Sequence, residues 1–543
     1  MIKMAAPVDI PIQHLPIVQA ILKAHLPPQA KIWVFGSRAK WTTHKGSDLD
    51  LAIDAGRKLT PKEDSSLNFA FEECDLPFKV DVIDMHAIAD TFKKIIETDK
   101  ILLQTNTGEQ DWREATLSEF IKIKHGYAFE GEFISSIPND NILVTPGNFN
   151  IGGGFKADKF KYYHESAFVE YILKPNDLIV TMTDLSKVGD TLGYPALVPN
   201  TKNIDYLHNQ RVGKVIFTGN GLDKFYTYYL MCSKKYRDEI LASATGTSIK
   251  HTSPIRIESF RFKLPPLPTQ RTIAAILGAL DDKIELNRRM NATLEAMARA
   301  LFKSWFIDFD PVRAKMEGRQ PYGIDAETAA LFPDSFVETE LGLVPEGWEV
   351  GSISDICSHI INGGTPARMT KSFWENGSIP WYKTGELTDS YLMKSGELVT
   401  EIALEKTSIR ILHKDSVLMA IYAAPTVGRL GILTEDSTFN QACTGMMPKK
   451  DVGTSFLFLN LYFGREWFNS RSNGAAQQNI SKSIVESFRI LIPSQEILHE
   501  FNLRTIHLFD QMKQLANENQ KLISTRDYLL PKLISGEVRV SNL

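Results

Sequence analysis

The chain has 543 residues, a length that predicts several separately packed domains rather than one core. Hydrophobic residues make up 43% and charged residues 23%, and no stretch approaches the roughly 20 apolar residues of a membrane helix. The net charge of -4 excludes neither nucleic acid nor other partners, because 61 basic and 65 acidic residues can be sorted into separate faces. Since the first residues also lack a signal-peptide pattern, we expect a soluble, cytoplasmic protein without a membrane partner.

The cysteine pattern gives no sign of a zinc ribbon or a disulfide framework. The four cysteines lie far apart and form no Cys-x-x-Cys pair: Cys74, Cys232, Cys357 and Cys443. Metal-binding and disulfide-rich domains need closely spaced cysteines. We therefore expect plain buried thiols.

Residues 1–110 contain three aspartates placed on predicted strands. Asp48 and Asp50 are two residues apart at the start of one strand, and Asp81 lies in a later strand at 79–83. Side chains alternate along a strand, so Asp48 and Asp50 point to one face, where they can share a divalent cation with Asp81. Two such ions can activate a hydroxyl and stabilise a pyrophosphate leaving group.

A glycine-serine turn precedes these aspartates. The buried strand at 31–35 runs into Gly36-Ser37-Arg38, where glycine permits close backbone approach and the start of a helix suits phosphate oxygens. The whole pattern resembles the minimal nucleotidyltransferase family. The resemblance implies an α/β domain with Mg²⁺ as cofactor and a nucleoside triphosphate as ligand. The implied catalytic and metal-binding residues are Asp48, Asp50 and Asp81, and the implied nucleotide-binding residues are Gly36, Ser37 and Arg38.

The activity of this first domain stays open at the sequence level. Trp41 stands where the family usually has glycine, and residues 85–110 are too few for a separate substrate-binding domain. An active enzyme and a degenerate domain used for docking both agree with the sequence.

The rest of the chain is an internal repeat. The segment ESFR at 258–261 recurs at 486–489, and 486 − 258 gives an offset of 228. The same offset relates further pairs without a gap: Gly246 and Gly474, Pro265 and Pro493, Leu280 and Leu508, Asn291 and Asn519, Leu294 and Leu522, and Leu301 and Leu529. The fronts of the two copies, 112–262 and 348–490, have diverged and are rich in glycine, aromatics and short β-branched runs. They predict mixed domains with substantial strand.

The back of each copy predicts one long helix, at about 270–306 and 495–530. Seam residues recur at alternating spacings of four and three in both: Leu280, Ile284, Asn287, Asn291, Leu294, Ala298, Leu301 and Trp305, then Leu508, Met512, Leu515, Asn519, Leu522 and Leu529. This is the heptad pattern of a coiled coil, in which Asn291 and Asn519 would be buried and fix the register. The first helix would be roughly 55 Å long. Antiparallel pairing suits helices joined through a whole domain; the alternative is two amphipathic helices in separate cores.

Two similar but unequal domains held apart by stiff helices suit a ligand with two subsites on a regular axis. Duplex DNA is such a ligand, because its helical repeat makes the spacing of half-sites a geometric quantity. The diverged fronts would then read different half-sites.

Four stretches strengthen this interpretation: LPPLPTQR at 264–271, WFIDF at 305–309, GLVPEGW at 342–348 and LLPKLISGE at 529–537. Together and in this order they resemble the specificity subunits of type I restriction–modification systems. The resemblance implies that two target-recognition domains bind a bipartite double-stranded DNA sequence without a cofactor. It also implies that the constant helices dock two methyltransferase subunits, which restriction and translocase subunits then join. Residues 112–543 agree, since they contain neither a glycine-rich methyl-donor motif nor a phosphate loop.

The expected fold is therefore α+β and multidomain. An N-terminal nucleotidyltransferase-like α/β domain precedes two mixed α/β target-recognition domains separated by two long antiparallel coiled-coil helices. The expected boundaries are 1–110 for the first domain, 111–265 and 341–493 for the recognition domains, 266–315 and 494–543 for the helical regions, and 316–340 for a linker.

Candidate DNA contacts lie just before the constant helices. They are Thr247, Lys250 and His251 in the first copy and Gln478, Asn479 and Lys482 in the second. Small, amide and basic side chains there suit phosphates or base edges, and a solvated turn is the competing interpretation. Asn209-Gln210 and Asn440-Gln441 raise the same question, and for them we favour hydrogen bonding inside the domain.

Two other functions compete with DNA recognition. One is a metal-dependent nucleotidyltransferase that acts on a protein or nucleic acid through its N-terminal domain. The other is a purely structural adaptor.

Overall fold

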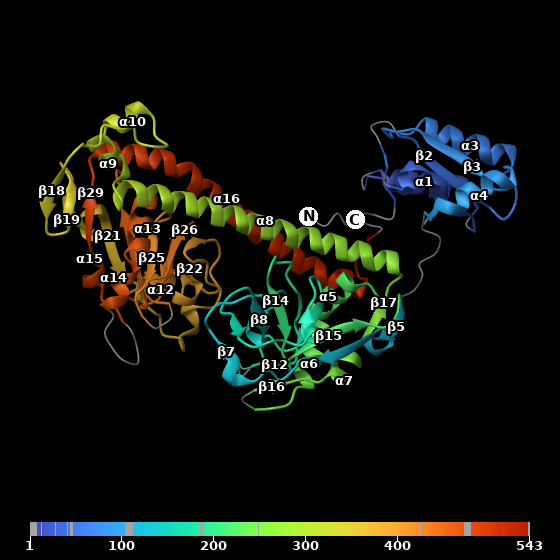
Figure 1. Cartoon of the computed structure of the whole chain (residues 1–543), viewed down its shortest axis with the longest axis horizontal. Coiled ribbons are helices and arrows are strands. Elements are labelled where there is room, and N and C mark those ends of the chain that lie inside the picture. Colours follow the sequence, from blue (N-terminus) through green and yellow to red (C-terminus); the bar gives the residue numbers. More distant parts are fainter. Residues whose placement is uncertain are drawn as a thin grey trace. The chain divides into compact units, whose positions relative to one another are not determined.

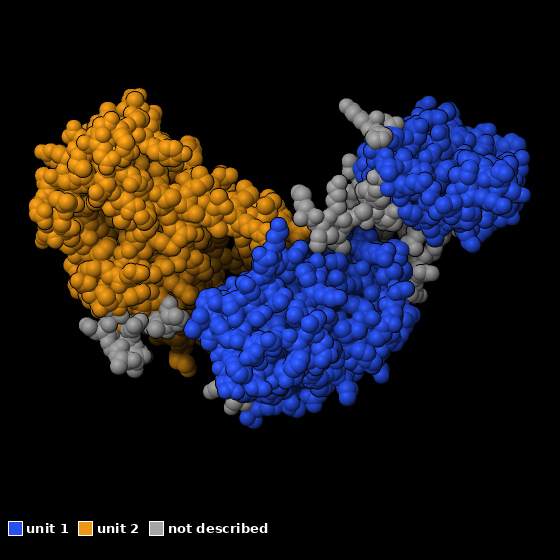
Figure 2. All heavy atoms as spheres, viewed as in Figure 1, with its two compact units in different colours: residues 1–278, 528–543 blue, residues 279–527 orange. Residues whose placement is uncertain are grey.

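The computed structural model describes residues 8–540, apart from 12–13, 28, 41, 44–46, 104–111, 185, 187, 248, 423–425 and 472–478. The chain divides into two compact units, residues 1–278 with 528–543 and residues 279–527 (Figure 2). No described helix combines the length and the hydropathy needed to cross a bilayer.

The N-terminal domain is a four-stranded sheet with helices on both faces (Figure 1). Its elements are α1 (Leu15–His25), β1 (Lys31–Phe35), α2 (Ser37–Lys40), β2 (Leu49–Asp54), α3 (Pro61–Glu72), β3 (Val80–Asp84), α4 (Asp90–Asp99) and β4 (Ile101–Leu102). The strand order is β3-β2-β1-β4, with β2 parallel to β3 and antiparallel to β1. This α/β domain is the one that the sequence predicts.

Alternation along β2 explains how the two layers form. Leu51 of β2 is buried in one cluster with Leu22 of α1 and Leu67 of α3, whereas Ala52 is buried in another cluster with Ile96 of α4. Successive side chains of a strand point to opposite faces, so a continuous apolar strand is covered on both sides.

The first of the two expected recognition domains combines short strands with small helices, of which the described residues form α5, α6 and α7. Its elements are β5 (Arg113–Thr116), β6 (Ile121–His125), β7 (Ile134–Ser135), β8 (Asn141–Val144), β9 (Lys161–Tyr163), β10 (Ile172–Leu173), β11 (Leu178–Thr181), β12 (Thr183–Asp184), β13 (Pro195–Leu197), β14 (Asp205–His208), β15 (Val212–Phe217), α5 (Lys224–Cys232), α6 (Lys234–Ala242), β16 (Lys250–His251), α7 (Pro254–Glu258) and β17 (Arg261–Leu264). The main sheet has the order β13-β11-β15-β6, and a second sheet has the order β10-β14-β8-β9-β7.

The second recognition domain has the same plan. Its elements, with the segment that leads into it, are α9 (Asp310–Met316), α10 (Ala326–Ala330), β18 (Phe336–Thr339), β19 (Gly342–Pro345), β20 (Glu349–Ser352), α11 (Ile353–Ile356), β21 (Cys357–Asn362), β22 (Ile379–Tyr382), β23 (Ser390–Leu392), β24 (Leu398–Val399), α12 (Glu401–Lys406), β25 (Val417–Ala420), β26 (Leu430–Leu433), β27 (Thr438–Phe439), β28 (Cys443–Pro448), α13 (Thr454–Phe463), α14 (Arg465–Ser470), α15 (Lys482–Glu486) and β29 (Arg489–Ile492). The main sheet has the order β21-β28-β25-β26-β23 and the smaller sheet β24-β22-β27.

Strand pairing confirms the duplication in the diverged fronts, where sequence similarity is weak. The antiparallel set β6, β15, β11 and β13 corresponds to β21, β28, β25 and β26. The parallel pair β8–β14 corresponds to β22–β27, and the closing pair β5–β17 to β20–β29. The repeated ESFR segment precedes the closing strand in both copies, and Phe260 within it is almost fully buried.

The segment 316–340, which the sequence predicts as a linker, contains regular structure. It includes α10 and β18, and β18 forms a two-stranded ribbon with β19. Phe332 is buried against Trp305 in the core of the second unit. Of the four cysteines, which the sequence predicts to be buried, Cys357 and Cys443 are buried, whereas Cys74 and Cys232 are only half-buried.

Two long helices carry the constant regions, α8 (Leu267–Phe306) and α16 (Gln495–Ser535) (Figure 1). They pair antiparallel: Asp281 of α8 accepts from Arg526, whereas Trp305 near the end of α8 packs on Phe501. In the first unit, the start of α8 and the end of α16 share one apolar cluster. The predicted heptad helices and their direction are confirmed.

The polar layer in the helix seam differs from the prediction in one partner. Asn287 is fully buried and donates to Asn519 Oδ1 at 3.1 Å and to Glu518 Oε2 at 2.8 Å. Asn291 and Asn519, which the sequence predicts to be buried, are both only half-buried. Residues related by the repeat face each other only at the midpoint of an antiparallel pair. Asn519 therefore contacts Asn287, which lies one seam position before Asn291 in α8.

Candidate nucleotide site and nucleic-acid interface

Gly36 and Asp50 are brought together by the antiparallel pairing of β1 with β2. Phe35, the last residue of β1, pairs with Asp50, and Gly36 follows with a φ of 72°. Glycine adopts this left-handed conformation without steric cost. A side chain on Gly36 would collide with the Asp50 carboxylate, so the glycine leaves the space that this carboxylate occupies.

The second and third aspartates surround Asp50. Asp81 lies directly beside it, because β2 and β3 are parallel with these two residues in register, and the exposed Asp48 immediately precedes β2. Burial raises the pKa of Asp50, and the negative charges of Asp81 and Asp48 raise it further. The three carboxylates therefore share one electrostatic environment, in which a bound cation is favourable.

The chemistry of these residues fits a divalent cation, since Mg²⁺ prefers carboxylate oxygens. One of the oxygens already has a partner: Lys79 Nζ lies 2.6 Å from Asp81 Oδ1. Within the described part of the chain, no three His, Cys, Asp or Glu side chains are gathered closely enough to hold a metal ion. The charges of the three aspartates thus influence one another, but their side chains do not converge on one metal position.

Arg38 is engaged with the protein backbone rather than pointing into solvent. Its buried guanidinium donates to the carbonyl oxygens of Asp9 and Ser47 at 2.7 Å each and of Asp48 at 3.1 Å. It also lies 4.0 Å from the ring centre of Phe78. These contacts fix the backbone that leads into the aspartates, while Trp41, the departure from the family pattern, lies outside the described residues.

Two of the DNA contacts predicted for the first copy lie on one short strand, with the third just before it. Lys250 and His251 form β16, which pairs antiparallel with β12, and His251 Nδ1 lies 3.1 Å from Thr183 Oγ1. Thr247 is exposed in the turn before β16. These predicted residues therefore share one small surface hairpin.

The second copy has a matching arrangement. Asn479 forms an antiparallel bridge with Tyr422, at the place where β16 pairs with β12 in the first copy. Lys482 begins α15 and lies 3.1 Å from Glu486 in an ion pair. Gln478 falls outside the described residues.

The Asn-Gln pairs have a structural role through their backbone. Gly126 directly follows β6 and packs on the carbonyl oxygens of His208 and Asn209. Gly363 packs in the same way on the carbonyl oxygen of Asn440. A side chain on either glycine would collide with these backbone atoms. The backbone at the two pairs therefore makes equivalent close contacts in the two domains. Of the side chains, Asn209 Oδ1 accepts from the Arg211 N–H and Gln441 accepts from Thr365, whereas the buried Asn440 Oδ1 has no hydrogen-bond partner among the described residues.

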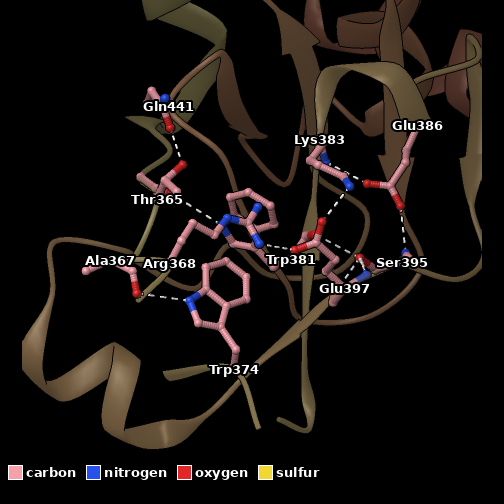
Figure 3. Close-up of polar contacts among 12 residues, drawn as sticks. Thr365, Ala367, Arg368, Trp374, Trp381, Lys383, Glu386, Ser395, Glu397 and Gln441 are labelled. Atoms are coloured by element: carbon pink, nitrogen blue, oxygen red, sulfur yellow. Dashed lines mark hydrogen bonds and ion pairs between the residues drawn. The ribbon is translucent and has the colours of Figure 1, made fainter. Parts of the chain in front are cut away.

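One cluster escaped the sequence analysis, on the loop at 363–370 (Figure 3). The Arg368 guanidinium lies 4.0 Å from the ring centre of Trp374 and 4.7 Å from that of Trp381, and it forms an ion pair with Glu397. These residues come from separate loops and strands. Only the fold brings them together, so no spacing in the sequence identifies them.

Comparison with family models covers almost the whole chain. The model described as "Type I restriction modification DNA specificity domain" matches residues 109–296 and 345–524. The model described as "Polymerase beta, Nucleotidyltransferase" matches residues 18–108.

Individual relatives agree with both matches. The chain is 29% identical over 390 residues to the type I restriction enzyme HindI specificity subunit of Haemophilus influenzae, covering 60% of this chain and 84% of that protein. It is 25% identical over 357 residues to the MjaIX specificity subunit of Methanocaldococcus jannaschii, covering 65% and 76%. Its first domain is 39% identical over 99 residues to the probable protein adenylyltransferase MntA of Haemophilus influenzae, covering 18% of this chain and 86% of MntA.

Among solved structures, the S subunit of a type I restriction–modification system from M. genitalium aligns with 80% of this chain and 98% of its own length. The TM-score is 0.49 and the identity 15%. The family-model matches, together with the duplicated domains and the helix pair, show that the chain belongs to the type I restriction–modification DNA specificity family and carries a nucleotidyltransferase-family domain ahead of the specificity region.

Proposed function

We propose that this chain recognises a bipartite double-stranded DNA target as the specificity subunit of a cytoplasmic type I restriction–modification complex. Residues 111–265 would read one half-site and residues 341–493 the other. The observation that carries the proposal is the duplicated domain joined to a single antiparallel helix pair, because one rigid spacer then sets the gap between two unlike readers.

The helix pair also offers surfaces for partner subunits. Apolar side chains that do not face the seam are exposed on both helices: Leu286, Met290 and Met297 on α8, and Leu503 and Ile506 on α16. Exposed apolar side chains on helices suit docking against helices of another chain. We assign this role to two methyltransferase subunits, with restriction and translocase subunits joining them.

The DNA contacts of this proposal include the two matching surface elements. In the first domain they are Thr247, Lys250 and His251, and in the second Gln478, Asn479 and Lys482. Support comes from the exposure of Thr247 and from the equivalent strand pairing of His251 and Asn479. Phosphate contacts by the lysines would make binding weaken steeply with salt.

The test is target mapping with the assembled enzyme. The chain is mixed with its cognate methyltransferase subunits and a random-sequence DNA library, and the methylated sites are sequenced. A bipartite motif with a fixed gap is the expected result. Methylation without any sequence preference, or none at all, would remove the proposal.

We also assign nucleotide and Mg²⁺ binding to the N-terminal domain. Asp48, Asp50 and Asp81 would hold the cation, while Gly36 and Ser37 at the start of α2 would face the phosphates. Mg²⁺ would offset the charge on the phosphates and on the attacking hydroxyl. Arg38 would act through the backbone that it holds. As an account of the whole chain, nucleotide transfer is not favoured, because this match is confined to residues 18–108.

Labelling with nucleoside triphosphates tests this second assignment. The full chain and its Asp48→Ala variant are incubated with labelled triphosphates and Mg²⁺, alone and with the partner subunits. Label transferred by the native chain and lost in the variant is expected. Equal labelling of both would exclude transfer by this domain.

A further inference from the structure

Residues 365 and 367–369 of the loop at 363–370 in the second recognition domain are exposed, and the loop is nevertheless held at several points (Figure 3). The indole N–H of Trp381 donates to the Gly364 carbonyl at 2.9 Å, and that of Trp374 donates to the Ala367 carbonyl at 3.2 Å. Thr365 of the same loop donates to Gln441, which lies between β27 and β28. Exposed loops are usually mobile, so three anchors within a few residues indicate that the position of the loop matters.

Arg368 on this loop is oriented by two kinds of contact. Its guanidinium stacks near Trp374 and Trp381 and pairs with Glu397, which also pairs with Lys383 at 2.5 Å. These two cations hold the pKa of Glu397 below its usual range, so the carboxylate stays charged. Aromatic stacking and an ion pair together restrict the long side chain to one geometry.

The oriented Arg368 side chain is also partly accessible. The Arg368 side chain is 49% exposed, and the next residue, Met369, is 93% exposed. An arginine held in one geometry and still half-exposed is suited to a partner that presents two acceptors in one plane.

The first recognition domain carries a different set of cationic and aromatic residues near Gly126, the glycine that matches Gly363. Tyr127, which follows Gly126 there, contacts Phe168 and Tyr171 at ring distances of 5.2 Å, and Lys124 lies 4.9 Å from the Tyr171 ring. Phe168 is 56% exposed. Unlike side chains beside the matching glycines are expected where two related domains read different half-sites.

We infer that Arg368 is a specificity-determining residue that reads a guanine in the half-site recognised by the second domain. The planar fork of arginine matches the O6 and N7 acceptors that guanine presents in the major groove, and Glu397 holds the fork in register. The inference rests on the proposed DNA-recognition function and adds to it one residue and one base.

The experiment compares the methylated motifs of the assembled wild-type complex and of complexes carrying Arg368→Ala or Arg368→Lys. Both variants are expected to lose the preference for guanine at one position of one half-site, by roughly 10- to 100-fold, while the other half-site is unchanged. Lysine keeps the positive charge but lacks the planar fork of arginine. Arg368→Lys therefore tests the inference independently if the alanine variant folds poorly. Glu397→Gln is expected to relax the same position more weakly.

Arg410, an exposed arginine of the same domain, provides the matched control: Arg410→Ala should leave the motif unchanged. An unaltered motif in both Arg368 variants would overturn the inference, and so would a uniform loss of affinity with a salt slope smaller by about one, which indicates a phosphate contact. A wild-type complex without a bipartite motif would instead refute the proposed function itself. The two failures are thus distinguishable.

Discussion

Neighbouring residues in the first domain act in different ways on the same aspartates. Gly36 leaves space for the Asp50 carboxylate, whereas Arg38 donates to the backbone carbonyl oxygens of Ser47 and Asp48 and to that of Asp9. The sequence motif places the two residues side by side and predicts nucleotide contact for both. Because Arg38 is buried and donates to backbone carbonyl oxygens, we expect it to position the backbone rather than to contact the nucleotide.

Replacing Arg38 by methionine tests this positioning role. Arg38→Met is expected to lower the free energy of unfolding of the N-terminal domain by about 1–3 kcal/mol, because three carbonyl oxygens lose a charged donor. Hydrogen exchange of residues 8–103 in the full chain measures the change. The control is Arg57→Met, which removes an exposed ion pair with Glu63 and should have a clearly smaller effect. Equal effects would contradict the assigned role.

His208 makes the stability of the first recognition domain depend on pH. Its buried ring lies 2.9 Å from the Val212 carbonyl oxygen, and burial lowers its pKa to about 4 from an ordinary 6.5. A depressed histidine pKa means that the folded domain disfavours the charged ring. Its contribution is therefore present above about pH 6.5 and is lost as the pH falls from there towards 4.

Chemical unfolding at a series of pH values measures this loss. For the native protein, the denaturant concentration at the unfolding midpoint should decrease as the pH is lowered from 6.5 to 4. His208→Gln should make this decrease smaller, because glutamine does not titrate. The same slope in both proteins would assign the pH dependence to other groups.

At the scale of elements, the helix pair combines a regular apolar seam with one polar layer. Ile284 and Ala298 of α8 are buried on either side of Asn287, whose amide joins Asn519 and Glu518 of α16. A polar layer of this kind specifies alignment, since any shift of register would leave buried amides without partners.

The two asparagines of α8 should respond differently to alanine. Asn287→Ala is expected to destabilise the helix pair by about 1–3 kcal/mol, because Asn519 and Glu518 lose a buried donor. Asn291→Ala should be nearly neutral, since Asn291 is half-buried and its buried Oδ1 has no hydrogen-bond partner. Chemical denaturation of the full chain compares them, and a larger effect at position 291 would refute the pairing.

At the scale of the whole molecule, the internal repeat combines two diverged domains with a helix pair of constant pattern. The two fronts share their strand pairing but not their surfaces, while α8 and α16 keep a common heptad pattern. Diverged readers on a constant spacer would allow the target sequence and the gap between half-sites to change independently.

Lengthening the spacer tests this division. Seven residues that keep the heptad register are inserted into α8 between 284 and 294 and into the facing part of α16. At about 1.5 Å per residue the pair grows by about 10 Å, which is about three base pairs of DNA at 3.4 Å each. The mapped motif should keep both half-sites and widen its gap by that amount. An unchanged gap would show that the helices do not set it.

Much of the architecture could be predicted from the sequence, because it depends on patterns within single segments. The heptads of 280–305 and 508–529 identify both long helices, and the shared offset identifies the duplication. Asp50 lies in register with Asp81 on the parallel neighbouring strand, whereas Asp48 immediately precedes β2. The predicted linker, with α10 and β18, was harder to assign because its elements are short.

What the sequence determined by itself was therefore periodic or local: the repeat, the helix seam and the spacing of the aspartates. The tertiary structure alone decided that Asn519 pairs with Asn287, that Arg38 turns to backbone carbonyls, and that Arg368 is held between Trp374 and Trp381. Periodicity is set by neighbours along one helix or strand. Contacts between distant segments depend on the path of the intervening chain, which no local spacing records.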